Sequence, residues 1–81
     1  MKKEELINYA MKGILADIRE LEKQVEKGKQ YLRMIENREE VPTKLSMNEI
    51  QAVIAQKREE IEKLDRMRFD LQWELSNPEE Q

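Results

Sequence analysis

The sequence predicts an all-α protein made of two long helices that form an antiparallel coiled-coil hairpin. Apolar residues recur in both halves of the 81-residue chain at alternating steps of three and four. Charged residues make up 41% of the chain, a level typical of coiled coils and long helices rather than of average globular domains. The chain holds two glycines and two prolines, so it can form few turns. We therefore expect a single domain over residues 1–81.

The first helix is expected to run from about residue 3 to about residue 38. Its apolar residues occupy positions a and d of a heptad repeat without a slip, and Gly28 takes one d position. Residues seven apart share a helix face, so these side chains form one stripe that needs a partner. This stripe, the seam of the first helix, consists of Ile7, Met11, Ile14, Ile18, Leu21, Val25, Leu32 and Ile35.

Residues 39–46 are expected to form the turn. Pro42 disfavours a helical conformation at Val41, the residue before it. Ser46 and Glu49 have the spacing of a capping box, in which each side chain accepts a hydrogen bond from the backbone amide of the other residue. Such a cap marks the start of a helix. A connection of this length favours folding the chain back on itself.

The second helix is expected to run from about residue 47 to about residue 76, followed by a short acidic tail over 77–81. Proline at position 78 disfavours a helical residue before it, so the helix should stop there. Lys57 and Arg68 occupy seam positions, where we expect their aliphatic stems to be buried and their charges to reach the edge. The apolar seam of this helix consists of Ile50, Ile54, Ile61, Leu64, Leu71 and Leu75.

Folding back about Pro42 predicts which parts of the two seams meet. Leu21 should lie near Leu64, and Gly28 should lie near Lys57. On this reading Gly28 makes room for the bulkier lysine. The alternative is that Gly28 allows another backbone to approach closely, or acts as a hinge.

Four large apolar residues fall outside both seams and are candidates for a protein interface: Phe69, Trp73, Tyr9 and Leu6. Phe69 and Trp73 lie four residues apart and therefore form one patch on the second helix. Tyr9 and Leu6 belong to the end of the first helix that a hairpin places beside Trp73. Adjacent aromatic residues on a polar helix are typical of interfaces, although single exposed apolar residues often have no role.

Self-association is the expected use of this surface. A two-helix hairpin buries little core, and small scaffolds without disulfides or metal usually oligomerise. We expect a homodimer that forms a four-helix bundle, or binding of a different protein. The alternative arrangement is that the two helices splay and each pairs with another chain.

The composition argues against catalysis and against cofactors. The chain has no His, so it lacks the commonest general base and a common metal ligand. It has no Cys, so it lacks a thiol nucleophile and a thiolate metal ligand. The carboxylates between residues 58 and 66 have the spacing of ordinary ion pairs with Lys and Arg on a solvated helix face. We expect no enzyme, no cofactor and no metal site.

No apolar run is long enough to cross a membrane and no signal peptide is recognisable, so a cytoplasmic location is expected.

The predicted function is a small protein–protein interaction module, an adaptor or regulator that acts through a helical surface. The short, Cys-free, Lys- and Glu-rich hairpin resembles the small regulators and accessory proteins of bacteria and their phages, a resemblance of class alone. One alternative is an inhibitor whose acidic residues, including Glu74, Glu79 and Glu80, mimic an anionic ligand. Another is a nucleic-acid accessory protein, but the net charge of −3 opposes it.

Overall fold

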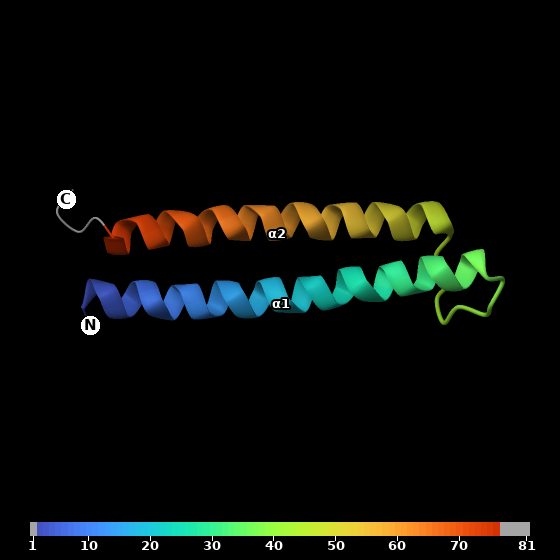
Figure 1. Cartoon of the computed structure of the whole chain (residues 1–81), viewed down its shortest axis with the longest axis horizontal. Coiled ribbons are helices and arrows are strands. Elements are labelled where there is room, and N and C mark those ends of the chain that lie inside the picture. Colours follow the sequence, from blue (N-terminus) through green and yellow to red (C-terminus); the bar gives the residue numbers. More distant parts are fainter. Residues whose placement is uncertain (1, 77–81) are drawn as a thin grey trace.

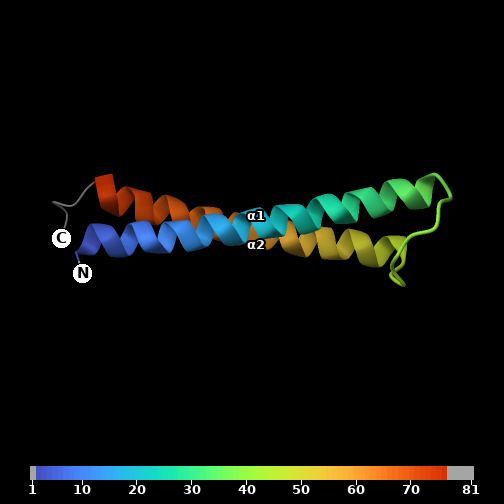
Figure 2. The ribbon, with the colours of Figure 1, turned by 90° about the horizontal axis from the view of Figure 1, so that it is seen from below.

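The computed structural model, which describes residues 2–76, consists of two helices that lie side by side (Figure 1). Helix α1 spans Lys3–Glu36 and helix α2 spans Met47–Ser76. The start of α1 and the end of α2 lie at one end of the molecule, and the connecting loop lies at the other. Seen from below, the helices cross near their middle (Figure 2). The predicted antiparallel helical hairpin is confirmed.

The molecule is long and thin, with dimensions of 58 × 18 × 16 Å. Its radius of gyration is 17.7 Å, whereas a compact domain of this length has about 12 Å. A rod of two helices has no interior layer, so every residue of α1 and α2 is near solvent on at least one side. This shape leaves most of the surface available for contacts.

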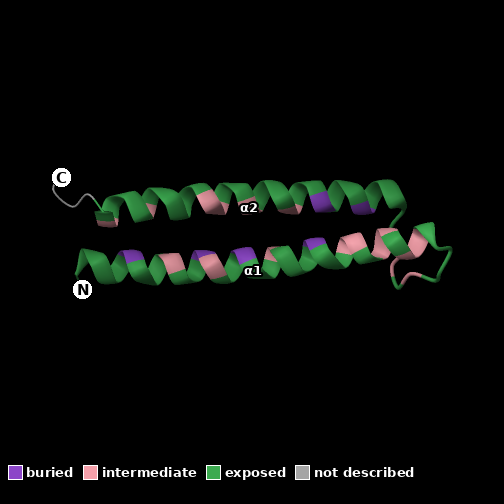
Figure 3. Cartoon of the chain, in the orientation of Figure 1, coloured by how far each residue is buried: buried purple, intermediate pink, exposed green. Residues whose placement is uncertain are grey.

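The seam between the helices forms the core. The buried residues lie on the facing edges of the two ribbons (Figure 3). Val25, Ile50 and Ile54 form one cluster near the loop, and Tyr31, Leu32, Ile35 and Ile61 pack against it. The buried side chains are Ile7, Ile14, Ile18, Val25, Ile50 and Ile54. The remaining seam residues, Met11, Leu21, Leu32, Ile35, Ile61, Leu64, Leu71 and Leu75, are half-buried.

Helix α1 ends at Glu36, two residues before the end expected from the sequence. Arg38 has a φ of 58°, in the left-handed region. The Arg38 amide donates to the Ile35 carbonyl at 3.0 Å, and the Glu39 amide donates to the Met34 carbonyl at 2.9 Å. These two bonds form a Schellman motif, which reverses the chain and satisfies the last carbonyls of the helix. The helix therefore stops at its own cap, before Pro42 can affect it.

The start of α2 has the predicted capping box. The Glu49 amide donates to the Ser46 hydroxyl at 3.2 Å, and the Ser46 amide donates to the Glu49 carboxylate at 3.1 Å. The Ile50 amide then donates to the Ser46 carbonyl at 2.9 Å, as the first helical bond. Upstream, the Thr43 hydroxyl accepts from the Leu45 amide at 3.2 Å. Local hydrogen bonds thus define where the second helix begins.

The pairing at Gly28 differs from the prediction. A Cβ atom built on Gly28 would lie 2.8 Å from Cγ1 and 3.0 Å from Cδ1 of Ile54, and 3.8 Å from Cγ2 of Ile50. The nearest atoms therefore belong to these isoleucines and not to Lys57. Gly28 lets the side chain of Ile54 approach the backbone of α1 closely, whereas the sequence suggested room for Lys57 or the close approach of another backbone. The predicted acidic tail, 77–81, lies outside the described residues.

Candidate interaction surface

The groove between the helices is open along both edges. On one side a hollow is lined by Asp17, Glu20, Leu21, Glu60 and Leu64. On the other side a hollow is lined by Lys29, Leu32, Gln51, Ile54, Ala55 and Arg58. The seam leucines and Ile54 form the floor of each hollow, and the other residues flank it. These two hollows identify the two sides of the hairpin.

The heptad repeat extends each side along the whole rod, because residues seven apart share a helix face. We call the first side the Met67 flank. It consists of Leu6, Ala10, Gly13, Asp17, Glu20, Gln24, Lys27, Tyr31 and Met34 on α1, and of Val53, Gln56, Glu60, Lys63, Met67, Asp70 and Glu74 on α2. We call the second side the Arg58 flank. It consists of Asn8, Leu15, Glu22, Lys29 and Glu36 on α1, and of Asn48, Gln51, Ala55, Arg58, Glu62, Asp65, Phe69, Gln72 and Ser76 on α2.

The aromatic pair Phe69 and Trp73 is exposed. Phe69 is 73% exposed and Trp73 is 59% exposed, although both are large apolar side chains. Phe69 lies two heptads after Ala55 and so belongs to the Arg58 flank. Trp73, one turn further on, lies toward the back of α2, away from α1. The pair therefore forms a continuous patch on one helix.

Leu6 and Tyr9 are also exposed, at 55% and 73%. Leu6 lies two heptads before Glu20 and so belongs to the Met67 flank. Tyr9 lies at the back of α1, which points away from the back of α2 because the two seams face each other. The four candidate residues thus share one end of the rod but not one face. They form two separate patches.

Two further exposed apolar residues lie on the Met67 flank. Met67 and Val53 are 52% and 40% exposed. Sequence reasoning assigned neither residue to an interface. The spacing of seven between Val53, Glu60 and Met67 shows in the sequence that these residues share one face of α2. Which face of α1 lies beside them becomes known only from the structure.

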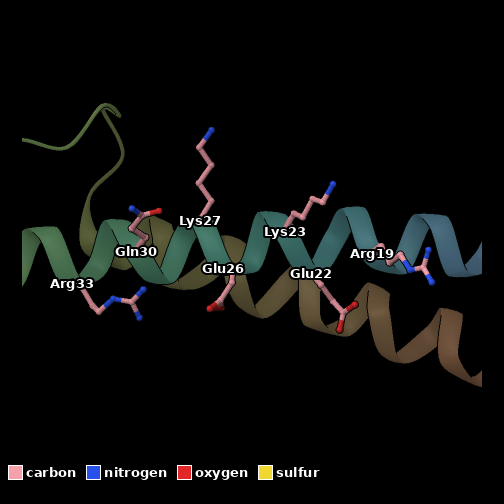
Figure 4. Close-up of a pocket in the computed structure, with 7 residues that line it drawn as sticks. All are labelled: Arg19, Glu22, Lys23, Glu26, Lys27, Gln30 and Arg33. Atoms are coloured by element: carbon pink, nitrogen blue, oxygen red, sulfur yellow. The ribbon is translucent and has the colours of Figure 1, made fainter.

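The back of α1 carries more positive than negative charge. A shallow surface region there is lined by Arg19, Glu22, Lys23, Glu26, Lys27, Gln30 and Arg33 (Figure 4). All seven residues come from α1, and the two lysines project to one side of the helix while the two glutamates project to the other. A surface built on one helix, with two glutamates among its cations, encloses no ligand.

Ion pairs of the described residues lie within single helices. Arg66 pairs with Glu62 at 3.2 Å, and Lys29 pairs with Glu26 at 3.8 Å. Arg68, at a seam position, pairs with Asp65 at 3.1 Å and keeps its side chain 44% exposed. Exposed pairs of this kind contribute little to stability, with a typical range of about 0–1 kcal/mol. The apolar seam therefore carries the packing between the helices.

Over residues 2–76 no group of three or more Asp, Glu, His or Cys side chains is arranged to hold a metal ion. Hydrogen bonds with Ser46 lower the pKa of the Glu49 carboxyl from its ordinary value of 4.5, and the bond from the Ser46 backbone has a larger effect than the bond from its side chain. That shift belongs to the helix cap. Neither described helix has an apolar stretch long enough to span a membrane.

These features describe a helical rod with exposed apolar residues at defined heptad positions. Its surface has two flanks of different character and an aromatic pair at the open end. Comparison of the chain with family models, curated proteins and solved structures finds no match.

Proposed function

We propose that the protein is a non-catalytic protein–protein interaction module, an adaptor or regulator that binds through its helical surface in the cytoplasm. The observation that carries this proposal is the exposure of Phe69 and Trp73 side by side on α2. Burying a large apolar side chain is worth roughly 1.5–3 kcal/mol, so a partner that covers the exposed pair gains binding free energy.

The position of the pair suits a binding role. A helix holds its side chains in fixed positions, so an aromatic pair on α2 loses little conformational freedom when a partner covers it. Tryptophan is enriched among the residues that dominate binding energy, and such residues are usually ringed by polar groups that exclude water. Asp65 and Arg66 lie one turn before Phe69 on the same helix and can supply that rim. A partner would therefore present an apolar cleft with polar edges.

A nucleic-acid role has one observation in its favour, the cations Arg19, Lys23, Lys27 and Arg33 on the back of α1. Glu22 and Glu26 lie among them and reduce the local positive charge. Binding to phosphates would require strong dependence on salt concentration. A salt-dependent mobility shift of labelled DNA or RNA would favour this alternative over the protein-binding proposal.

The test of the proposal is affinity purification, in which the parent and each variant serve as bait in the same cells and the co-purified proteins are compared. Proteins retained by the parent should be lost from the double variant Phe69→Ser, Trp73→Ser and kept by Tyr9→Ser, which changes an equally exposed aromatic residue at the back of α1. Circular dichroism should show that all three baits are equally helical. Retention of the same proteins by the aromatic double variant would overturn the proposed role of the pair.

A further inference from the structure

The Met67 flank and the aromatic pair are different surfaces, and the Met67 flank has its own signs of an interface. Leu6, Val53 and Met67 remain exposed along it, although each directly precedes a seam position in the sequence. The Arg58 flank, by contrast, is lined mainly by Lys, Arg, Glu and Gln outside the aromatic end. A helix that packs on one neighbour needs apolar residues only at heptad positions a and d. A helix in a bundle also carries apolar residues at e or g. Both helices carry additional apolar residues on the same flank.

The surface area of the chain leaves room for a second copy. The accessible surface is 6756 Å², whereas a compact monomer of 9.8 kDa has about 5,200 Å². A stable interface buries about 800 Å² on each partner. The excess of the rod over a compact monomer is therefore large enough for such an interface. No described side chain is fully buried, so the seam itself would gain from a second layer.

We propose that a second copy of this chain covers the Met67 flank, with the two open ends together, so that α1 of each copy lies on α2 of the other. The two-fold axis then runs along the rod, and the product is a four-helix bundle. This assigns self-association to the Met67 flank and leaves Phe69 and Trp73 exposed for a different protein.

Charge complementarity favours this orientation, with two pairs of opposite charge against one pair of like charge, Asp17 and Asp70. Leu21 and Leu64 line one hollow, so Glu20 and Lys63 lie at nearly the same height along the rod, about 3 Å apart in rise. When α1 lies on α2 of the second copy, Glu20 of each chain meets Lys63 of the other. Lys27 and Glu60 lie at similarly close heights and form a second pair of opposite charges. Each contact occurs twice because of the two-fold axis.

The opposite orientation is unfavourable. If the two copies ran in opposite directions and were centred on the hollow, α1 would lie on α1 and α2 on α2. Asp17 and Glu20 of one chain would then lie against the same carboxylates of the second copy. Like charges placed opposite one another disfavour association, and Lys63, which lies on α2, would no longer face Glu20. The parallel arrangement also brings Tyr31 of one copy over Val53 of the other, at matching heights.

The test is sedimentation equilibrium of the full chain with matched variants. The parent should be a dimer, and Met67→Glu should weaken the dimer by about tenfold or more while helical content is retained. Phe69→Glu makes the same charge change two residues away on the Arg58 flank and should leave the dimer intact. A parent that is monomeric at every concentration, or a dimer lost with Phe69→Glu but not with Met67→Glu, would overturn the proposal.

Charge reversal tests the orientation without changing an apolar residue. Glu20→Lys and Lys63→Glu should each weaken the dimer by about tenfold, and the double variant should restore it, because both contacts become pairs of opposite sign again. Glu22→Lys, on the Arg58 flank, is the control and should have no effect. Dimerisation that is unaffected by either single reversal would contradict the orientation. These variants leave the aromatic pair intact, so failure here is distinguishable from failure of the proposed function.

Discussion

At the residue scale, the two glycines of α1 differ in whether a neighbouring side chain needs the space that a Cβ atom would occupy. A Cβ atom on Gly13 would meet nothing within 4 Å, whereas one on Gly28 would lie 2.8 Å from Cγ1 of Ile54. Glycine within a helix costs roughly 0.5–1 kcal/mol relative to alanine. At Gly28 the close packing of the helices offsets that cost. At Gly13 nothing within the single chain does.

Gly13→Ala and Gly28→Ala should therefore change the stability of the hairpin in opposite directions. Gly13→Ala should raise the free energy of unfolding by roughly 0.5–1 kcal/mol. Gly28→Ala should lower it, because Ile54 is β-branched and cannot turn away freely, and overpacking costs about 1–3 kcal/mol. Urea denaturation at a protein concentration where the chain is monomeric measures both changes. Equal stabilisation by both alanines would mean that the helices do not approach closely at Gly28.

Arg38 carries backbone strain at the end of α1. Its φ of 58° lies in the left-handed region, which costs a residue with a Cβ atom roughly 1–2 kcal/mol. Arg38→Gly should relieve much of that strain and stabilise the hairpin by about 1 kcal/mol, which thermal unfolding can measure. Asn37→Gly is the control, because Asn37 has a φ of −86° and has no such strain to relieve. An equal gain from both variants would contradict this account of the cap.

The cap of α2 is the clearest local determinant at the element scale. Ser46→Ala removes the hydroxyl that accepts from the Glu49 amide and should destabilise the hairpin by about 1 kcal/mol, within the range of 0.5–2 for such caps. Equilibrium denaturation measures the change. Thr43→Ala, which also removes a hydroxyl that accepts one backbone bond in the loop, is the comparison and should cost less because it caps no helix. A Ser46→Ala variant as stable as the parent would show that α2 does not depend on this cap.

The Glu49 half of the cap should depend on pH. Its pKa is lowered in the folded chain by the hydrogen bonds with Ser46, so the folded state favours the ionised form. The stability that this carboxylate contributes is present above the unfolded pKa and is lost as the pH falls through the lowered folded pKa. Glu49→Gln keeps an acceptor that does not titrate. The parent should therefore lose stability relative to Glu49→Gln on acidification, and a constant difference between them across that range would contradict the assignment.

The elements differ in how far the sequence could predict them. Both heptad ladders and the Ser46–Glu49 cap depend on residues within a few positions of one another, so the helices and the start of α2 followed from the sequence. The end of α1 did not, because an arginine in the left-handed region has no sequence signal comparable to glycine. The pairing of Gly28 with Ile54 depends on how the loop positions α2. The two flanks likewise become visible only once the pairing of the helices is known.

At the scale of the whole molecule, the seam and the outward faces should respond differently to the same kind of substitution. Ile18→Ser places a hydroxyl where Ile18 is buried between the helices, and large-to-small changes at such sites cost roughly 2–5 kcal/mol. A two-helix rod with a thin core cannot tolerate that loss, so circular dichroism should show unfolding. The double variant Phe69→Ser, Trp73→Ser should keep its helical content. If the aromatic variant unfolded instead, the pair would be part of the core.

The hairpin itself can be measured most directly as a distance within one chain. Glu22 and Lys63 lie at matching heights of α1 and α2, since Leu21 and Leu64 line one hollow. The chain contains no native cysteine, so Glu22→Cys and Lys63→Cys accept two spin labels and no others. Labelled chains diluted with unlabelled ones restrict the measurement to pairs within one molecule. The hairpin predicts a short separation, of the order of two neighbouring helices, about 10–20 Å between labels. A separation near 60 Å, the length of the intervening residues in one extended helix, would contradict it.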